Sequence, residues 1–288
     1  MNSAERSSPF FGPGGNGDTF RATGLKTSDI PLWLNEQGLD AYEYEAGRGI
    51  SATPAQLRAL GKNAAAAGIR LSLHAPYFIS LSGVVMETRL KSIDYIKQSV
   101  EAAEIMGAET IVVHTGSAAK ISREEAMRLA ADTLYKTLEA IPDSRVKIGL
   151  ETMGKINQLG TLSEVLSLCA MDKRLVPVVD FGHMNARELG GRFRGKDDYR
   201  SVFEQIANTL DASSARNLHC HFSKIEWSKS GEKCHLTFED TTFGPAFEPL
   251  MEVILSEKLT PTIICESAGS QTEDAYSMKK YYYSLRSR

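Results

Sequence analysis

Cysteine is scarce in this sequence, and long apolar runs and a strong net charge are missing. The four cysteines form no Cys-x-x-Cys pair, which argues against a disulfide framework and against a structural zinc knuckle. No run of about 18 consecutive apolar residues occurs, and the first residues contain no apolar signal core, so we expect a cytoplasmic protein without a membrane partner. The net charge of −3 at pH 7 gives no overall attraction to nucleic acid. A nucleic-acid partner would therefore need a local basic surface.

An internal linker is also missing, and this predicts a single domain. No Pro-, Gly- or Ser-rich stretch divides the 288 residues, of which 42% are hydrophobic. We expect a short tail at residues 1–8 and one large core over residues 9–288.

Short apolar runs alternate along the chain with segments of helical periodicity, a pattern typical of parallel strands joined by helices. We expect strands at residues 10–14, 40–46, 69–75, 109–116, 146–151, 175–181, 217–223 and 261–266. We expect helices at residues 53–68, 86–107, 122–141, 161–170, 197–211, 246–257 and 273–285. Eight strands in this length predict an α/β fold, a closed (β/α)8 TIM barrel.

Polar residues stand at the ends of these apolar runs, where packing gives them no reason to be. All six histidines end or closely follow such a run: His74, His114, His183, His219, His221 and His235. Carboxylates hold equivalent positions at Glu151, Asp180 and Glu266. Burying such groups unpaired costs several kcal/mol, and a metal ion would supply the missing partner. One histidine alone is more often a satisfied core or capping residue, but six together predict a metal centre at the carboxyl ends of the strands.

The donor set favours a cluster of ions. The expected ligands are His74, His114, Glu151, Asp180, His183, His221, His235 and Glu266, with His183 and His235 on loops above the strand ends. Eight ligands are too many for one ion. Imidazole and carboxylate donors suit zinc or manganese, and Glu151 could bridge two ions.

The segments around these residues resemble the endonuclease IV family of abasic-site endonucleases. The similar segments are HAPYFISLSG, IVVHTGS, ETMGKINQLGTLSEV, VVDFGHMNA, HCHFSKIEW and TIICES. The resemblance implies one Zn²⁺ on His74, His114 and Glu151, a second on Glu151, Asp180, His221 and Glu266, and a third on His183 and His235. It implies His221 rather than His219 as the ligand of its strand, Glu151 as the residue essential to catalysis, and Tyr77 beside a flipped-out abasic nucleotide, although a surface tyrosine is equally common there. The implied reaction is hydrolysis of DNA 5′ to an abasic site by metal-bound hydroxide, with Mn²⁺ as another possible metal.

Two features depart from the family pattern. Lys233 stands where the family usually has an aspartate ligand of the third zinc, and Glu232 is the nearest substitute. We therefore expect the third ion to be weakly held or absent, with Lys233 contacting the substrate phosphate instead. The early loop YEYEAGRGI is short and acidic where a DNA-inserting loop would be basic and aromatic.

A basic segment, NARELGGRFRGK, follows the sixth expected strand. The cations expected near DNA phosphate are Arg187, Arg192, Arg194, Lys196, Lys224, Lys229 and Lys233, with Arg192 and Arg194 as the main contacts. The same segment could equally be a solvated loop. Phe193 could stack on an unpaired base or anchor the loop to the barrel.

Two other functions remain open. A sugar isomerase or epimerase of the xylose-isomerase-like superfamily would need only a one-metal site of Glu151, Asp180, His221 and Glu266. A non-catalytic DNA-binding relative would not need to keep the ligands. His74, His114 and His235 favour the phosphodiesterase, which we expect to act as a monomer on DNA containing abasic sites.

Overall fold

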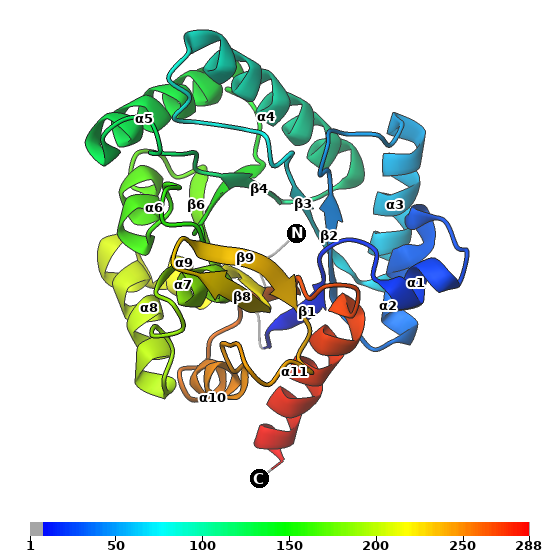
Figure 1. Ribbon diagram of the computed structural model, residues 1–288. Helices are drawn as coiled ribbons and strands as arrows, with labels where there is room; N and C mark the ends of the chain where they lie inside the picture. The colour runs from blue at the N-terminus through cyan, green and yellow to red at the C-terminus, as the bar shows by residue number, and fades with distance from the viewer. Residues whose placement is uncertain (1–7, 288) are drawn as a thin grey trace.

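A closed barrel of eight parallel strands forms the centre of the molecule (Figure 1). The computed structural model describes residues 8–287, so residues 1–7 of the expected tail lie outside the described residues. The strand order is β1–β10–β7–β6–β5–β4–β3–β2. The ring closes between β1 and β2, where the Gly15 amide donates to the Glu43 carbonyl at 2.9 Å. The expected TIM barrel, a single domain, is confirmed.

The barrel strands are β1 (Phe10–Pro13), β2 (Ala41–Glu45), β3 (Arg70–His74), β4 (Thr110–His114), β5 (Lys147–Glu151), β6 (Leu175–Asp180), β7 (His219–Phe222) and β10 (Thr262–Cys265). A separate hairpin is formed by β8 (Lys224–Ser228) and β9 (Gly231–Leu236). The helices are α1 (Asp18–Ala22), the 3-10 helix η1 (Thr27–Asp29), α2 (Ile30–Glu36), α3 (Pro54–Ala67), α4 (Met86–Met106), α5 (Arg123–Ala140), α6 (Leu162–Cys169), α7 (Phe181–Arg187), α8 (Lys196–Thr209), α9 (Ala212–Arg216), α10 (Glu248–Ser256) and α11 (Gln271–Arg286).

All eight expected barrel strands form, each slightly shorter than its apolar run, and the seven expected helices are α3, α4, α5, α6, α8, α10 and α11. Several start where a side chain caps the first turn: Thr53 and Thr161 form capping boxes, and Ser122 accepts from the Glu125 amide. The periodicity missed the short elements and the β8–β9 hairpin, which folds over the barrel mouth (Figure 1). In the described part of the chain, no helix is long and apolar enough to cross a membrane.

Glycine is required where the barrel closes. Gly12 of β1 faces β2 so closely that a Cβ at this position would lie 1.8 Å from the Ala41 carbonyl oxygen. Because that atom belongs to the backbone of a barrel strand, it cannot rotate away as a side chain could. A substitution must therefore push the two closing strands apart.

We expect Gly12→Ala to lower the free energy of unfolding by about 3 kcal/mol or more, because overpacking here acts on two backbones. Gly195→Ala is the matched control, since a Cβ there meets nothing within 4 Å. Urea denaturation followed by circular dichroism measures both variants. Similar losses for the two would contradict a tight closure at Gly12.

Candidate metal centre

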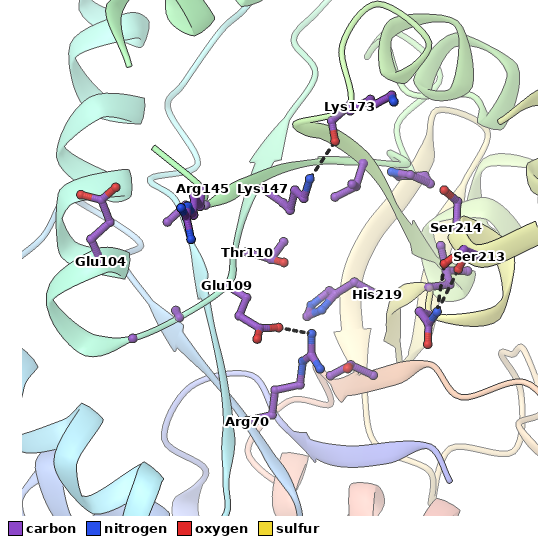
Figure 2. A pocket seen from close by; sticks show the side chains of 18 of the residues that line it. Arg70, Glu104, Glu109, Thr110, Arg145, Lys147, Lys173, Ser213, Ser214 and His219 are labelled. Atoms are coloured by element: carbon purple, nitrogen blue, oxygen red, sulfur yellow. Dashed lines mark hydrogen bonds and ion pairs between the residues drawn. The ribbon is translucent and has the colours of Figure 1, made fainter. Parts of the chain in front are cut away.

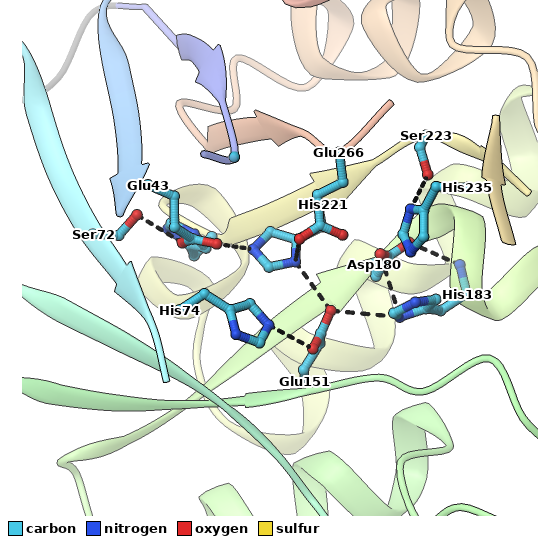
Figure 3. Close-up of polar contacts among 12 residues, drawn as sticks. Glu43, Ser72, His74, Glu151, Asp180, His183, His221, Ser223, His235 and Glu266 are labelled. Atoms are coloured by element: carbon cyan, nitrogen blue, oxygen red, sulfur yellow. Dashed lines mark hydrogen bonds and ion pairs between the residues drawn. The ribbon is translucent and has the colours of Figure 1, made fainter. Parts of the chain in front are cut away.

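The ends of the parallel strands bring the expected ligands to one rim of the barrel. His74, His114, Glu151 and Asp180 are the last residues of β3, β4, β5 and β6. Strand register pairs His114 with Glu151, and it pairs Asp180 with His221 of β7. Glu266 directly follows β10. The side chains consequently converge over the barrel axis (Figure 3).

Glu151 lies at the centre of this group. Its carboxylate is 3.4 Å from His74 Nε2, 3.1 Å from His114 Nε2, 3.4 Å from His183 Nδ1 and 3.0 Å from His221 Nδ1. The residue is fully buried. Four imidazoles around one buried carboxylate are the arrangement expected of a shared, bridging ligand.

Among the described residues, five groups of candidate ligand atoms lie within 4.8 Å of one another. Two of them, Glu43–His219–His221 and Glu43–Glu45–Glu266, involve carboxylates of β2, and the other three, the ligand sets, contain the expected ligands. The sets are His74–His114–Glu151, Glu151–Asp180–His221–Glu266, and His183–Glu232–His235. One buried oxygen of each of two carboxylates, Glu151 Oε2 and Asp180 Oδ2, accepts no hydrogen bond from any described residue. Orphaned anionic oxygens beside imidazole nitrogens suit a divalent cation, so these residues fit a metal centre.

A β-bulge in the hairpin explains how Glu232 joins the third set. Glu226 pairs with Cys234 but Trp227 pairs with Glu232, so Lys233 is an extra, unpaired residue. The extra residue breaks the strict alternation of faces and turns Glu232 to the same side as His235. Glu232 Oε2 then lies 3.5 Å from His183 Nε2.

Two expectations about the third set need correction, and Lys233 lies apart from it. His183 and His235 are not on loops: His183 lies in α7, whose first turn Asp180 caps at 2.7 Å, and His235 lies in β9. Lys233 is exposed and contacts Glu226 on the facing strand, with 2.6 Å between Nζ and Oε1. The lysine that was expected to disfavour the third ion therefore has its own carboxylate partner.

The imidazoles and carboxylates shift one another's charge states. Burial would raise the pKa of Glu151, but the close imidazoles of His114, His183 and His221 hold it well below its usual range. Burial would lower the pKa of His74, but the neighbouring Glu45 and Glu151 raise it to about 10.

Sequence reasoning missed two carboxylates of β2. Glu43 and Glu45 alternate with Tyr42 and Tyr44, which puts both carboxylates on one face of the strand. Glu45 keeps exposed surface toward the cavity, but the protein around its carboxylate removes much of its solvation. This desolvation, partly offset by the charge of His74 and reinforced by that of Glu43, raises the pKa of Glu45 to about 7. The pattern YEYE, inside the strand expected at residues 40–46, was the available signal, but its carboxylates were considered only as part of the acidic segment YEYEAGRGI.

A cavity of about 460 Å³ opens above the ligands. Glu45, Tyr77 and Lys155 line it together with the ligands. Tyr77 is half exposed, and its hydroxyl accepts from Arg48 Nε at 3.2 Å. A larger cavity of about 930 Å³ lies at the opposite, amino-terminal end of the strands, where Arg70 pairs with Glu109 beside His219 (Figure 2). It lies away from the three ligand sets.

Much of the predicted basic surface is occupied in holding loops. Arg187 donates to the carbonyls of Lys155 at 2.7 Å and of Ile156 at 2.9 Å. Lys224 donates to the Phe238 and Asp240 carbonyls, and Lys196 pairs with Glu252. Arg194, Lys229 and Lys233 remain exposed.

Phe193 anchors its loop. Its ring stacks on Tyr199 with 4.3 Å between centroids and packs against Phe181. The Arg192 guanidinium lies 5.6 Å over the same ring, and the side chain is 21% exposed. These contacts favour the anchoring interpretation of Phe193 over stacking on a base.

Comparison with known proteins gives one family and several relatives. A model of the family described as "Xylose isomerase-like TIM barrel" matches residues 32–281. An uncharacterized protein of Methanocaldococcus jannaschii is 27% identical over 217 residues, covering 74% of this chain and 77% of that protein. A probable endonuclease 4 of Staphylococcus carnosus is 29% identical over 160 residues, covering 54% and 52%. The chain thus spans about half the length of this endonuclease relative.

Solved structures share the fold. Endonuclease IV from Thermus thermophilus superposes with a TM-score of 0.69 at 19% identity, covering 97% of this chain and 100% of that one. A D-tagatose 3-epimerase-like protein superposes with a TM-score of 0.71 at 19% identity, covering 96% and 97%. At these identities the likeness establishes the barrel and leaves the reaction open.

The third ligand set generates a prediction about metal content. Glu232→Gln should lower the metal bound per chain by one ion, because two imidazoles remain without an anion. Lys233→Met should leave the count unchanged, since this side chain contacts Glu226. Elemental analysis of dialysed, zinc-loaded samples measures both. An unchanged count in Glu232→Gln, or equal losses in the two variants, would contradict the role of the bulge.

The charge network predicts how stability depends on pH when metal is removed. The pKa of His74 is raised from 6.5 to about 10. A pKa raised by folding adds stability that is fully present below the unfolded value and is lost as the pH rises through the folded value. The chelator-treated protein should therefore lose stability between about pH 6.5 and pH 10. Urea titrations across this range should give a shallower slope for His74→Asn, and an identical slope would exclude His74 as the cause.

Proposed function

The chain belongs to the xylose isomerase-like TIM barrel family, and we propose that within this family it is a metal-dependent phosphodiesterase that cleaves DNA 5′ to abasic sites. The observation that carries the proposal is the sharing of Glu151 between two of three ligand sets. A one-ion enzyme has no use for the set around His74 and His114, nor for the set around His183 and Glu232. The names of the endonuclease 4 relatives point in the same direction.

Divalent metal would supply the chemistry. We propose zinc, held by His74, His114 and Glu151, by Glu151, Asp180, His221 and Glu266, and by His183, Glu232 and His235. Bound ions would polarise the phosphate oxygens, lower the pKa of water and stabilise charge on the leaving 3′ oxygen. The buried carboxylates neutralise much of the cationic charge, so the centre stays stable inside the barrel.

The chain's own residues orient the substrate. Tyr77 lines the cavity with its hydroxyl tied to Arg48, which suits a contact with the deoxyribose at the missing base. Lys155, exposed on the cavity rim, is well sited to contact a backbone phosphate. Among the cations proposed from the sequence, Arg194 and Lys233 are the more accessible, and Arg192 is partly covered by Phe193. Such contacts would bind DNA without reading its base sequence.

A second candidate is a sugar epimerase that uses one ion. The set of Glu151, Asp180, His221 and Glu266 is sufficient for it. Glu45 adds a carboxylate with a pKa raised to about 7, which is suitable for proton transfer at a carbon next to a carbonyl. The fold is shared with a D-tagatose 3-epimerase-like protein.

One assay separates the two functions. Zinc-loaded protein should cut a duplex that carries a single abasic site, leaving a 3′-hydroxyl, and should not exchange the α-proton of a ketose with D₂O. Loss of a residue that merely supports a metal ligand typically costs about 10–100-fold in activity or metal affinity. Glu151→Gln, which alters a shared ligand itself, should therefore reduce cleavage by more than about 100-fold without unfolding the barrel.

The control is Glu87→Gln on the exposed face of α4, where Glu87 pairs with Lys91 on the surface. It should cleave like the unaltered protein. Ketose exchange without abasic cleavage would replace the nuclease with the epimerase.

A further inference from the structure

Three candidate ligand histidines are held in the same way, through Nδ1. His74 Nδ1 is 2.8 Å from the backbone carbonyl of the next residue, and His183 Nδ1 is 3.0 Å from the Thr152 carbonyl. His235 Nδ1 is 2.8 Å from the Ser223 hydroxyl. Since a carbonyl only accepts, Nδ1 of His74 and His183 carries the proton. Nε2 is thereby left to face a cation.

His221 is held in the opposite sense. Its Nε2 lies 2.8 Å from Glu43 Oε1, while its Nδ1 lies 3.0 Å from Glu151 Oε1 and 3.3 Å from Glu266 Oε1. The side chain is fully buried. Nε2 faces away from the second ligand set, and in a neutral imidazole whose Nδ1 binds a cation it carries the proton. Nδ1 is then the nitrogen that faces the ligand set.

Glu43 is itself fixed inside the barrel. Strand register places it opposite Ser72, whose hydroxyl donates to Oε2 at 2.7 Å. His219 Nε2 lies 2.9 Å from the same oxygen. Ser72 and His219 thus hold one oxygen of the carboxylate, while the other faces His221. Figure 3 shows this carboxylate between Ser72 and His221, on the side away from Glu151.

We propose that Glu43 is a positioning residue that reverses His221, so that this histidine alone among His74, His183, His221 and His235 binds metal through Nδ1. The proposal rests on the proposed metal centre and extends it by Glu43 and by the two residues that hold Glu43, Ser72 and His219. A carboxylate partner on the far nitrogen also makes the imidazole a more basic ligand. His219 thus acts through Glu43 and does not bind the metal.

Glu43→Gln is an informative change because the two carboxylate oxygens have different partners: Oε2 accepts from Ser72, and Oε1 lies 2.8 Å from His221 Nε2. An amide has one acceptor oxygen and one NH₂ donor of similar size. If its NH₂ faces His221, two donors meet and the imidazole must change tautomer. If it faces Ser72 and His219, the supports are lost. Either way the second ligand set should bind zinc more weakly, by about 10–100-fold.

The experiment measures ligand atoms and affinity without DNA. Protein with ¹⁵N-labelled histidine is loaded with Zn²⁺, and long-range ¹H–¹⁵N spectra assign each tautomer. We expect one Nδ1-coordinated imidazole, whose signal disappears in His221→Asn. Competition with a chromogenic chelator then compares Zn²⁺ affinities of the unaltered protein, Glu43→Gln and Asp274→Asn. Asp274 is the matched control, a buried carboxylate that instead accepts from the Phe238 amide and Ser270.

Coordination of His221 through Nε2 would overturn the proposal, as would a Zn²⁺ affinity of folded Glu43→Gln within about twofold of the control. The spectra of the unaltered protein decide the question even if Glu43→Gln does not fold. Failure to cut abasic DNA would overturn the proposed reaction alone, because both readouts here concern metal binding.

Discussion

The burial of one carboxylate, Glu151, is the constraint on which the rest of this site depends. An anion at the end of a central barrel strand, with no exposed surface, is stable only when its charge is balanced. Parallel strands end at one rim, so neighbouring strands can supply the compensating imidazoles at fixed register. Without metal, these imidazoles balance the negative charge of Glu151. The same arrangement directs imidazole nitrogens and carboxylate oxygens at shared positions where a cation can bind.

Support for the ligands comes from two different structural devices. Around the rim, backbone carbonyls and a hydroxyl hold the Nδ1 atoms of the histidines, which needs no special residue on the facing strand. Inside the barrel the strands use backbone carbonyls in the ladder that joins them. Glu43 takes that place for His221, and the regular alternation of β2 and β3 puts Ser72 beside it. In the β8–β9 hairpin the alternation is interrupted, because the bulge at Lys233 turns Glu232 toward His183.

The sequence predicted the barrel and its rim because both follow from strong local patterns. Apolar runs locate the strands, and a polar residue at the end of such a run, as at His74 or Asp180, marks the rim. The bulge was not predictable, because an extra residue in one strand leaves no mark in the periodicity of GEKCH. Contacts between distant segments were also hidden: Arg187 could be recognised as basic, but not as a clamp on the carbonyls of another loop.

The family alone does not determine the reaction, since the barrel of this chain superposes both on an endonuclease and on an epimerase-like protein. Glu151, Asp180, His221 and Glu266 satisfy either chemistry, so these four residues carry no information about the choice. The choice between the two reactions depends on the third ligand set, which a one-ion epimerase would not need. A buried His183 beside Glu232 and His235, brought together by a bulge and a short helix, is costly to maintain unless a cation binds there. Phosphate esters, whose cleavage develops charge on both the attacking and the leaving oxygens, benefit from such additional cations, and ketose epimerisation does not.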